Sequence, residues 1–175
     1  MRYFTRDLYR RCRSTDEAIL NAACEEWEQA NESYERHVAV ILPGFPPHLR
    51  EFAELLLHDA KVQSIARQGD QLILVLQKDI PPRDLVILSY ALAGEPVVEP
   101  FAEAPADWSR PTTFQFDELD VERASEETIY SQSLVFGNGW LMRLRFRDVR
   151  VTVAQSVYPA AVSGSLPAFA LPQTA

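Results

Sequence analysis

Cysteine and long apolar runs are scarce in this sequence, and both shortages exclude classes of protein. The two cysteines, Cys12 and Cys24, are too few for a disulfide scaffold and form no CxxC pair, so we expect reduced thiols. No stretch approaches the roughly 20 apolar residues that a membrane-spanning helix needs. Residues 1–7 run directly into charge without the apolar segment of a secretory signal. These features predict a cytoplasmic protein with no membrane partner.

Basic charge is also in short supply. Seventeen Lys and Arg residues stand against 25 Asp and Glu residues, which gives a formal net charge of −8. A negative field repels phosphate backbones, so we expect no nucleic-acid partner. The sequence lacks the glycine-rich loops that hold nucleotide phosphates and the G-x-S-x-G turn of serine hydrolases, and we predict no cofactor. Hydrophobic residues at 47% of the 175 nevertheless fit an ordinary globular protein.

The first 60 residues show helical periodicity. Ser14 and Glu17 have the spacing of a capping box, which predicts the start of a long helix. A short helix over 6–13 is expected before it, and Pro47 is well placed to open a third helix whose apolar stripe reaches Leu56. Apolar residues recur every three or four positions along one face of the long helix. The residues on that face are Ile19, Ala23, Trp27, Ala30 and Tyr34.

After Asp59 the pattern changes from helical to alternating, which predicts strands. Gly69-Asp70 and Gly137-Asn138-Gly139 have the composition of tight hairpin turns. Residues 93–111 contain four prolines and no periodicity, so we expect a long loop there. A bend or bulge is expected near Asp148. The expected strands are 62–67, 72–77, 85–90, 112–116, 128–136, 140–146 and 149–153.

A run of helices followed by a run of strands predicts an α+β fold with a largely antiparallel sheet. We expect about seven strands in a curved sheet, sandwich-like or an open barrel, with the N-terminal helices packed on it. The predicted single domain covers 1–158, with a helical part at 1–60 and a β-rich part at 61–158. The remainder, 159–175, has the composition of a frayed tail.

The pair His58-Asp59 is the first candidate for chemistry. Adjacent His and Asp at the end of a helix resemble the metal-binding pair of the HD-type phosphohydrolases, which would make His58 and Asp59 metal ligands. His37, one of three histidines, would stand for that family's first histidine. The resemblance ends where hairpins follow the pair directly. We favour the alternative that His58 caps a helix end and Asp59 turns the chain into the first strand.

Alternating arginines in the segment 140–147 are the second candidate. In a strand, Arg143, Arg145 and Arg147 lie on one face about 6.6 Å apart, where they would bind an anion or another small ligand. The alternative, which we favour, is a solvated face that pairs with carboxylates of neighbouring strands. Acidic residues available for such pairs are Asp117, Glu118, Glu122 and Glu126.

Aromatic side chains form the third candidate. Several lie at the end of the proline-rich loop or on the strands after it, where they would line a cleft for an apolar or peptide ligand. Packing in the core is the alternative, which we favour. The residues concerned are Trp108, Phe114, Phe116 and Tyr130.

The segment 2–8, Arg-Tyr-Phe-Thr-Arg-Asp-Leu, resembles the start of a bacterial family of unknown function. Its members begin with a Tyr-Phe-Thr-Lys/Arg-x-Leu signature. The helical stretch behind the signature and Leu57-His58-Asp59-Ala60 before the hairpins extend the resemblance over most of residues 1–150. The family implies no activity, cofactor or site, and it makes His58-Asp59 part of a structural junction.

No complete catalytic constellation emerges from these patterns. We therefore predict a non-catalytic binding or protein-interaction module from a bacterium, with a protein partner of unknown identity. Two alternatives stay open. One is a metal-dependent hydrolase that uses His58 and Asp59, and the other is an anion- or ligand-binding protein that uses the arginine face.

Overall fold

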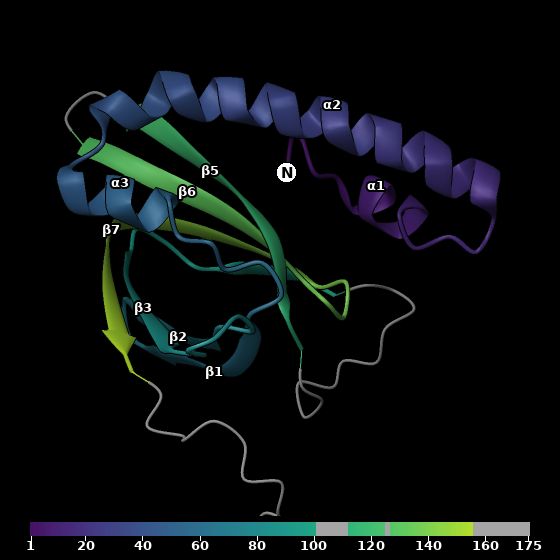
Figure 1. The fold of residues 1–175 in the computed structure, drawn as a ribbon. Helices are drawn as coiled ribbons and strands as arrows, with labels where there is room; N and C mark the ends of the chain where they lie inside the picture. The colour runs from purple at the N-terminus through teal and green to yellow at the C-terminus, as the bar shows by residue number, and fades with distance from the viewer. Residues whose placement is uncertain (101–111, 125–126, 156–175) are drawn as a thin grey trace, which may run out of the picture.

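The computed structural model describes residues 1–100, 112–124 and 127–155 of the chain (Figure 1). Within these residues, four helical elements come first and seven strands follow. The helices are α1 (Arg6–Arg11), α2 (Glu17–Ile41), the 3₁₀ turn η1 (Leu42–Gly44) and α3 (Pro47–Ala53). The strands are β1 (Lys61–Gln68), β2 (Gln71–Gln77), β3 (Leu85–Leu92), β4 (Val97–Glu99), β5 (Phe114–Ala124), β6 (Glu127–Phe136) and β7 (Leu141–Ala154).

All seven strands belong to one antiparallel sheet. Their order is β1-β2-β3-β7-β6-β5, and β4 pairs with the start of β7. The sheet is strongly curved and is not closed into a barrel. The predicted α+β class, with N-terminal helices on a curved antiparallel sheet of about seven strands, is therefore confirmed.

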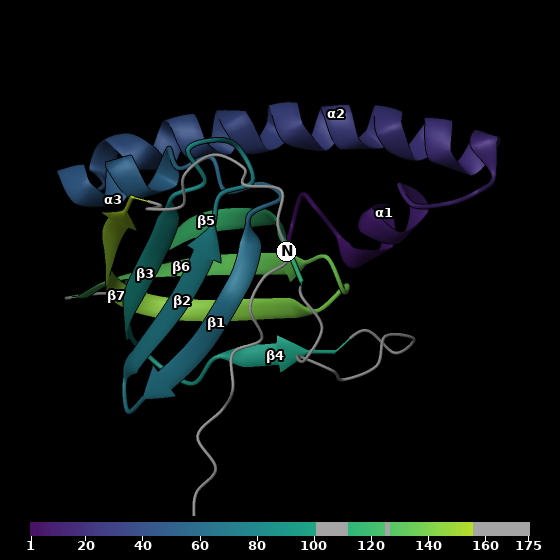
Figure 2. The ribbon, with the colours of Figure 1, turned by 60° about the horizontal axis from the view of Figure 1, so that its bottom comes forward.

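Strand β7 produces the curvature. Its first half pairs with β6, whereas its second half pairs with β3. The register between β3 and β7 shifts between Ala91 and Leu92, opposite the expected bulge near Asp148. Strands β1–β3 consequently run at an angle to β5–β7 (Figure 2).

The two outer strands of the sheet approach each other at one end. The backbone N–H of Asp59 donates to the carbonyl of Phe114 at 2.8 Å, and the N–H of Phe114 donates to the carbonyl of Ala60 at 2.8 Å. The hollow side of the sheet, which we call the inner face, is covered by α3. The opposite side is called the outer face.

The inner face carries the main core. Leu49 and Phe52 of α3 pack into it against Tyr90 of β3 and Phe146 of β7. A second, smaller cluster of Tyr9, Val135 and Leu141, with Met1 and Phe116 at its margin, forms where α1 meets the outer face. Both clusters include residues of β6 and β7.

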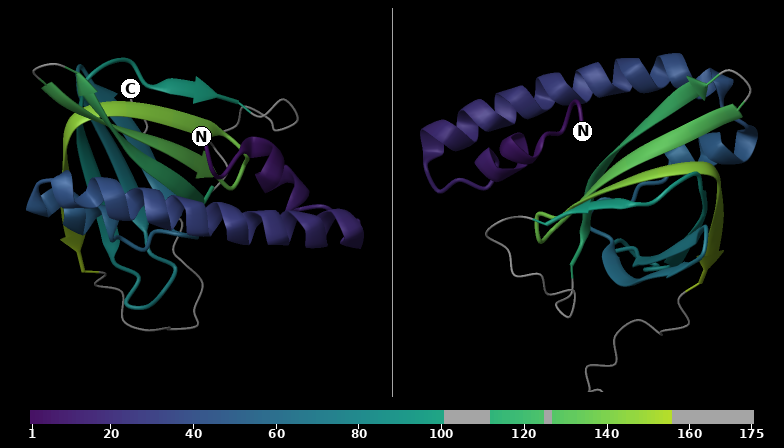
Figure 3. Two further views of the ribbon diagram at one scale, coloured as in Figure 1. Left: turned by 90° about the horizontal axis from the view of Figure 1, so that it is seen from above. Right: turned by 180° about the vertical axis from the view of Figure 1, so that it is seen from behind.

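Helix α2 lies along β5 at the edge of the sheet, and its N-terminal half extends beyond the sheet together with α1 (Figure 3). The hydroxyl of Tyr34 accepts a hydrogen bond from the edge N–H of Leu119 at 2.7 Å. Asp16 caps the helix by accepting from the N–H of Ala18 and Ile19. The predicted cap, Ser14, instead accepts from the N–H of Asp16.

Three other local predictions need correction. Helix α3 ends at Ala53, so Leu56 lies beyond it and is 82% exposed. The predicted loop 93–111 contains the short strand β4, while its residues 101–111 lie outside the described part of the chain. The predicted strand 112–116 extends to Ala124. Both hairpin turns formed as expected, and Gly69 and Gly139 have positive φ angles of 61° and 79°.

Candidate functional site

Two adjacent carboxylates on β5 point to opposite faces of the sheet. Alternation along the strand places Asp117 on the inner face with Leu119, which is part of the main core, and places Glu118 on the outer face. The side chain of Glu118 is buried there and accepts backbone N–H groups of residues 2–4. These three hydrogen bonds fix the N-terminal segment to the sheet. The three hydrogen bonds give the Glu118 carboxylate a structural role, whereas the fold gives no such role to the carboxylate of Asp117.

Asp117 lies at the end of a hydrogen-bonded chain on the inner face. Its Oδ2 atom accepts a hydrogen bond from Nε2 of Gln132 at 2.7 Å. Oε1 of Gln132 in turn accepts from the hydroxyl of Tyr90 at 2.7 Å. Gln132 is 2% exposed and Tyr90 is fully buried. The network therefore crosses the core from β3 to β5 and ends at a carboxylate.

A pocket of about 520 Å³ opens above this carboxylate. It lies between the C-terminal half of α2, the segment from α3 to Leu57, and strands β5 and β6. Asp117 and Gln132 line it together with Asn31 and Glu35 of α2. The volume is within the range of small-molecule sites, and most of the surface is apolar. Its apolar and aromatic lining includes Tyr34, Val38, Leu42, Phe52, Leu57 and Leu119.

Burial dominates the electrostatics of Asp117. Removal from water raises the pKa of its carboxyl from 3.8 to about 6, because the charged form loses hydration. The hydrogen bond from Gln132 opposes this rise in pKa, and the neighbouring charge of Glu118 adds to it. Burial also raises the pKa of the Tyr34 hydroxyl, so Tyr34 stays neutral. At neutral pH the pocket thus holds an ionised carboxylate.

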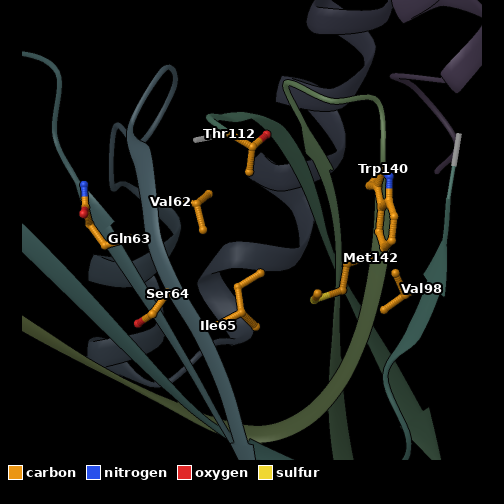
Figure 4. A pocket seen from close by; sticks show the side chains of 8 residues that line it. All are labelled: Val62, Gln63, Ser64, Ile65, Val98, Thr112, Trp140 and Met142. Atoms are coloured by element: carbon orange, nitrogen blue, oxygen red, sulfur yellow. The ribbon is translucent and has the colours of Figure 1, made fainter. Parts of the chain in front are cut away.

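A second pocket, of about 590 Å³, lies across the gap between β1 and β4 (Figure 4). Val62 and Ile65 of β1 face Trp140, which immediately precedes β7, and Met142 of β7. Its polar lining residues are Gln63, Ser64 and Thr112. Among the described residues, no ionisable side chain lines this pocket, so its chemistry is limited to apolar contact and neutral hydrogen bonds.

His58 and Asp59 lie in the turn between α3 and β1. The His58 side chain is 66% exposed, its Nδ1 atom contacts the carbonyl of Gln115, and its Nε2 atom lies 3.4 Å from Oδ2 of Asp59. Asp59 has a φ of 62° and turns the chain into β1. Since α3 ends at Ala53, His58 does not cap that helix, which corrects the favoured prediction.

The residues that the structure describes do not form a metal shell around this pair. His37 instead lies on α2, where Nε2 is 3.1 Å from Oδ1 of Asp120. Within the described part of the chain, no three His, Cys, Asp or Glu side chains gather closely enough to hold a metal ion. The residues therefore provide no support for the hydrolase alternative.

Each of the three arginines singled out from the sequence forms an ion pair. Arg143 lies 3.0 Å from Glu99 of β4. The other two pairs are Arg145–Glu122 at 2.7 Å and Arg147–Glu127 at 2.6 Å. These side chains are about half exposed and lie among carboxylates. The arrangement matches the alternative of a solvated, paired face, although only Glu122 is among the partners that the sequence suggested.

The predicted aromatic cleft is not assembled by the described residues. Phe114 and Tyr130 are buried in the main core, where Tyr130 packs against Phe45 and Phe146. Phe116 contacts the other cluster. Trp108 lies outside the described residues.

Sequence reasoning named Asp117 only as a partner for the arginine face, which the structure corrects, and it did not find Gln132. Gln132 lies two residues from both Tyr130 and Leu134 and therefore shares their inward-facing side of β6. Asp117 lies two residues before the inward-facing Leu119 of β5. A polar residue on the buried side of an alternating strand was the available signal. It needed the register of β5 against β6, which the sequence does not provide.

Comparison with known proteins adds no assignment. No family model matches the chain, and no curated protein matches it. The resemblance of the N-terminal signature to a bacterial family consequently stays a prediction. None of the helices in the described segments has the length and apolar character required to cross a membrane.

Proposed function

We propose that the protein is a binding module that takes a small molecule, with an apolar body and a polar head group, into the pocket beside Asp117. This retains the binding function predicted from the sequence and narrows its ligand. One observation carries the proposal: a carboxylate with a raised pKa lies in a mainly apolar pocket and receives one hydrogen bond from the described residues.

The free-energy cost of removing the Asp117 carboxylate from water supports a functional role for this residue. Burying a charge with few hydrogen-bond donors destabilises a fold, whereas an apolar residue would pack at the same position without this penalty. Carboxylates in such surroundings are concentrated at functional sites. The contrast with Glu118, whose charge meets three donors, shows that this chain can satisfy a buried carboxylate when the fold requires it.

Titration with 4-phenyl-1-butanol tests the proposal, because this probe joins an apolar body to a neutral head group. We expect backbone amide NMR shifts to change around Asp117, Leu119 and the C-terminal half of α2. The variant Ala39→Phe places a ring on a residue that lines the pocket and should abolish these changes. Ala22→Phe makes the same substitution at an exposed position of α2 outside the pocket and should preserve them.

Two results would overturn the proposal. The first is that neither 4-phenyl-1-butanol nor an analogue with a charged head group on the same apolar body causes localised shift changes in the wild-type protein up to millimolar concentration. The second is equal binding by the two phenylalanine variants, because the probe would then occupy some other surface.

A further inference from the structure

The charged groups of the Asp117 pocket are all of one sign. Among the residues that the structure describes, its lining includes the carboxylates of Glu35 on α2 and Asp117 on β5, and no Lys, Arg or His. The neutral polar groups come from Asn31, Tyr34 and Gln132. Asn31 donates to Glu35 at 2.8 Å, so this amide orients one carboxylate without neutralising it.

The surroundings of the pocket reinforce the negative sign. On β5, Glu118 and Asp120 follow the inward-facing Asp117, and the charges of all three act on the Tyr34 hydroxyl. Two basic groups of α2 lie next to the pocket residues in the sequence: Arg36, which donates to the carbonyl of Glu32 and the hydroxyl of Ser33, and His37, which pairs with Asp120. The segment from α3 and strand β6 contribute no titratable side chain to the lining. An anionic ligand would meet repulsion here, while a cation would meet attraction.

We propose that the ligand of this pocket is an organic cation, an ammonium group carried on an apolar body. This inference rests on the proposed function and specifies its ligand class. A carboxylate has about four lone-pair sites, so Asp117 can accept from an ammonium while Oδ2 keeps its bond from Gln132. The rings of Tyr34 and Phe52 and the aliphatic lining would cover the remaining body of the ligand.

The inference also predicts how binding depends on pH. An alkylammonium stays protonated below about pH 10, as a lysine side chain does. Binding a cation stabilises the ionised form of Asp117 and should lower the pKa of its carboxyl from about 6. Below that value, free Asp117 is protonated, so ligand binding must displace its proton. Affinity for a cation therefore falls as the pH drops through 6.

Three probes with one apolar body separate the charge from the shape. Near pH 8, we expect 4-phenylbutylamine to bind roughly tenfold or more tightly than 4-phenyl-1-butanol, and 4-phenylbutanoate to bind more weakly than either. Asp117→Asn should remove most of the preference for the amine, because the amide keeps the shape and loses the charge. Glu28→Gln also removes one negative charge, at an exposed position of α2 outside the pocket. It should leave the preference for the amine over the alcohol intact.

The outcomes distinguish this inference from the proposed function. If the alcohol binds in the pocket and the amine binds no more tightly, the function stands and the cationic ligand class is wrong. The ligand class is also wrong if Asp117→Asn and Glu28→Gln reduce amine affinity equally, since the attraction would then be general. If none of the three probes binds in the pocket, both fail. A preference that disappears only in Asp117→Asn and below about pH 6 supports both.

Discussion

Asp117 and Glu118 are neighbours on one strand, and their carboxylates have opposite environments. Glu118 faces outward and receives three backbone N–H groups at 2.6, 2.7 and 2.6 Å. Asp117 faces inward and receives one side-chain N–H at 2.7 Å. Glu118 is buried and Asp117 is half-buried, so the two carboxylates differ in exposure as well as in the number of donors. The comparison shows how a buried charge that supports the fold differs from one that is available to a ligand.

Removing the charge of Glu118 should have the largest effect on stability. Glu118→Gln replaces an acceptor of three N–H groups by an amide that accepts with one oxygen, and we expect the free energy of unfolding to fall by about 4 kcal/mol. Urea unfolding of the wild type and the variant at neutral pH measures this loss of stability. Hydrogen exchange at Tyr3 and Phe4 should also accelerate. Glu122→Gln, which alters an exposed ion pair, is the control, and an equally small loss in both variants would contradict this role.

Asp117 should make the protein less stable as the pH rises. Its pKa is raised to about 6 in the folded state, so the folded protein binds a proton more tightly than the unfolded chain does. The resulting stabilisation is present below pH 4 and lost as the pH rises through 6, a change of about 2–3 kcal/mol. Asp117→Asn cannot show this change. The difference in unfolding free energy between wild type and variant should therefore shift by that amount between pH 4 and 8, and parallel curves would refute the assignment.

The hydroxyl of Tyr90 should have an intermediate effect. Tyr90→Phe leaves Oε1 of Gln132 buried without its donor, at a cost of about 1–2 kcal/mol in urea unfolding. Tyr130→Phe removes a hydroxyl from the same core that makes no hydrogen bond to the described residues, and it should cost less. Equal losses would show that the network adds nothing beyond packing.

The arginines of the outer face should matter least. Arg145→Gln breaks an ion pair whose side chains are 53% and 49% exposed, so we expect a loss below about 1 kcal/mol. Binding of 4-phenylbutylamine should not change. A large loss of binding would move the functional site from the inner face to this arginine stripe.

Periodicity predicted the architecture because local patterns determine it. The helical face of α2 and the turns at Gly69 and Gly139 follow from residues close together in the sequence. The α+β class and the approximate number of strands followed from these elements. The end of α3 was missed because the apolar residues after Ala53 continue its stripe without continuing the helix.

The candidate site depends on contacts between distant segments, and the sequence could not supply them. The bonds from Tyr90 to Gln132 and from Gln132 to Asp117 join three strands. Only the register of β5 against β6 turns Asp117 inward and Glu118 outward. The sequence suggested His58 and the arginines of β7 as site residues because each pattern lies within a few consecutive positions. Local patterns identify spacing, whereas burial of a charge is a property of the folded chain.

A direct NMR titration of the Asp117 side-chain carboxyl carbon tests the central claim most directly. We predict a midpoint near pH 6, about two units above that of an exposed aspartate, and a lower midpoint once 4-phenylbutylamine is bound. A midpoint near pH 4 without ligand would contradict the claim, because this carboxylate would then be as well solvated as one on the surface.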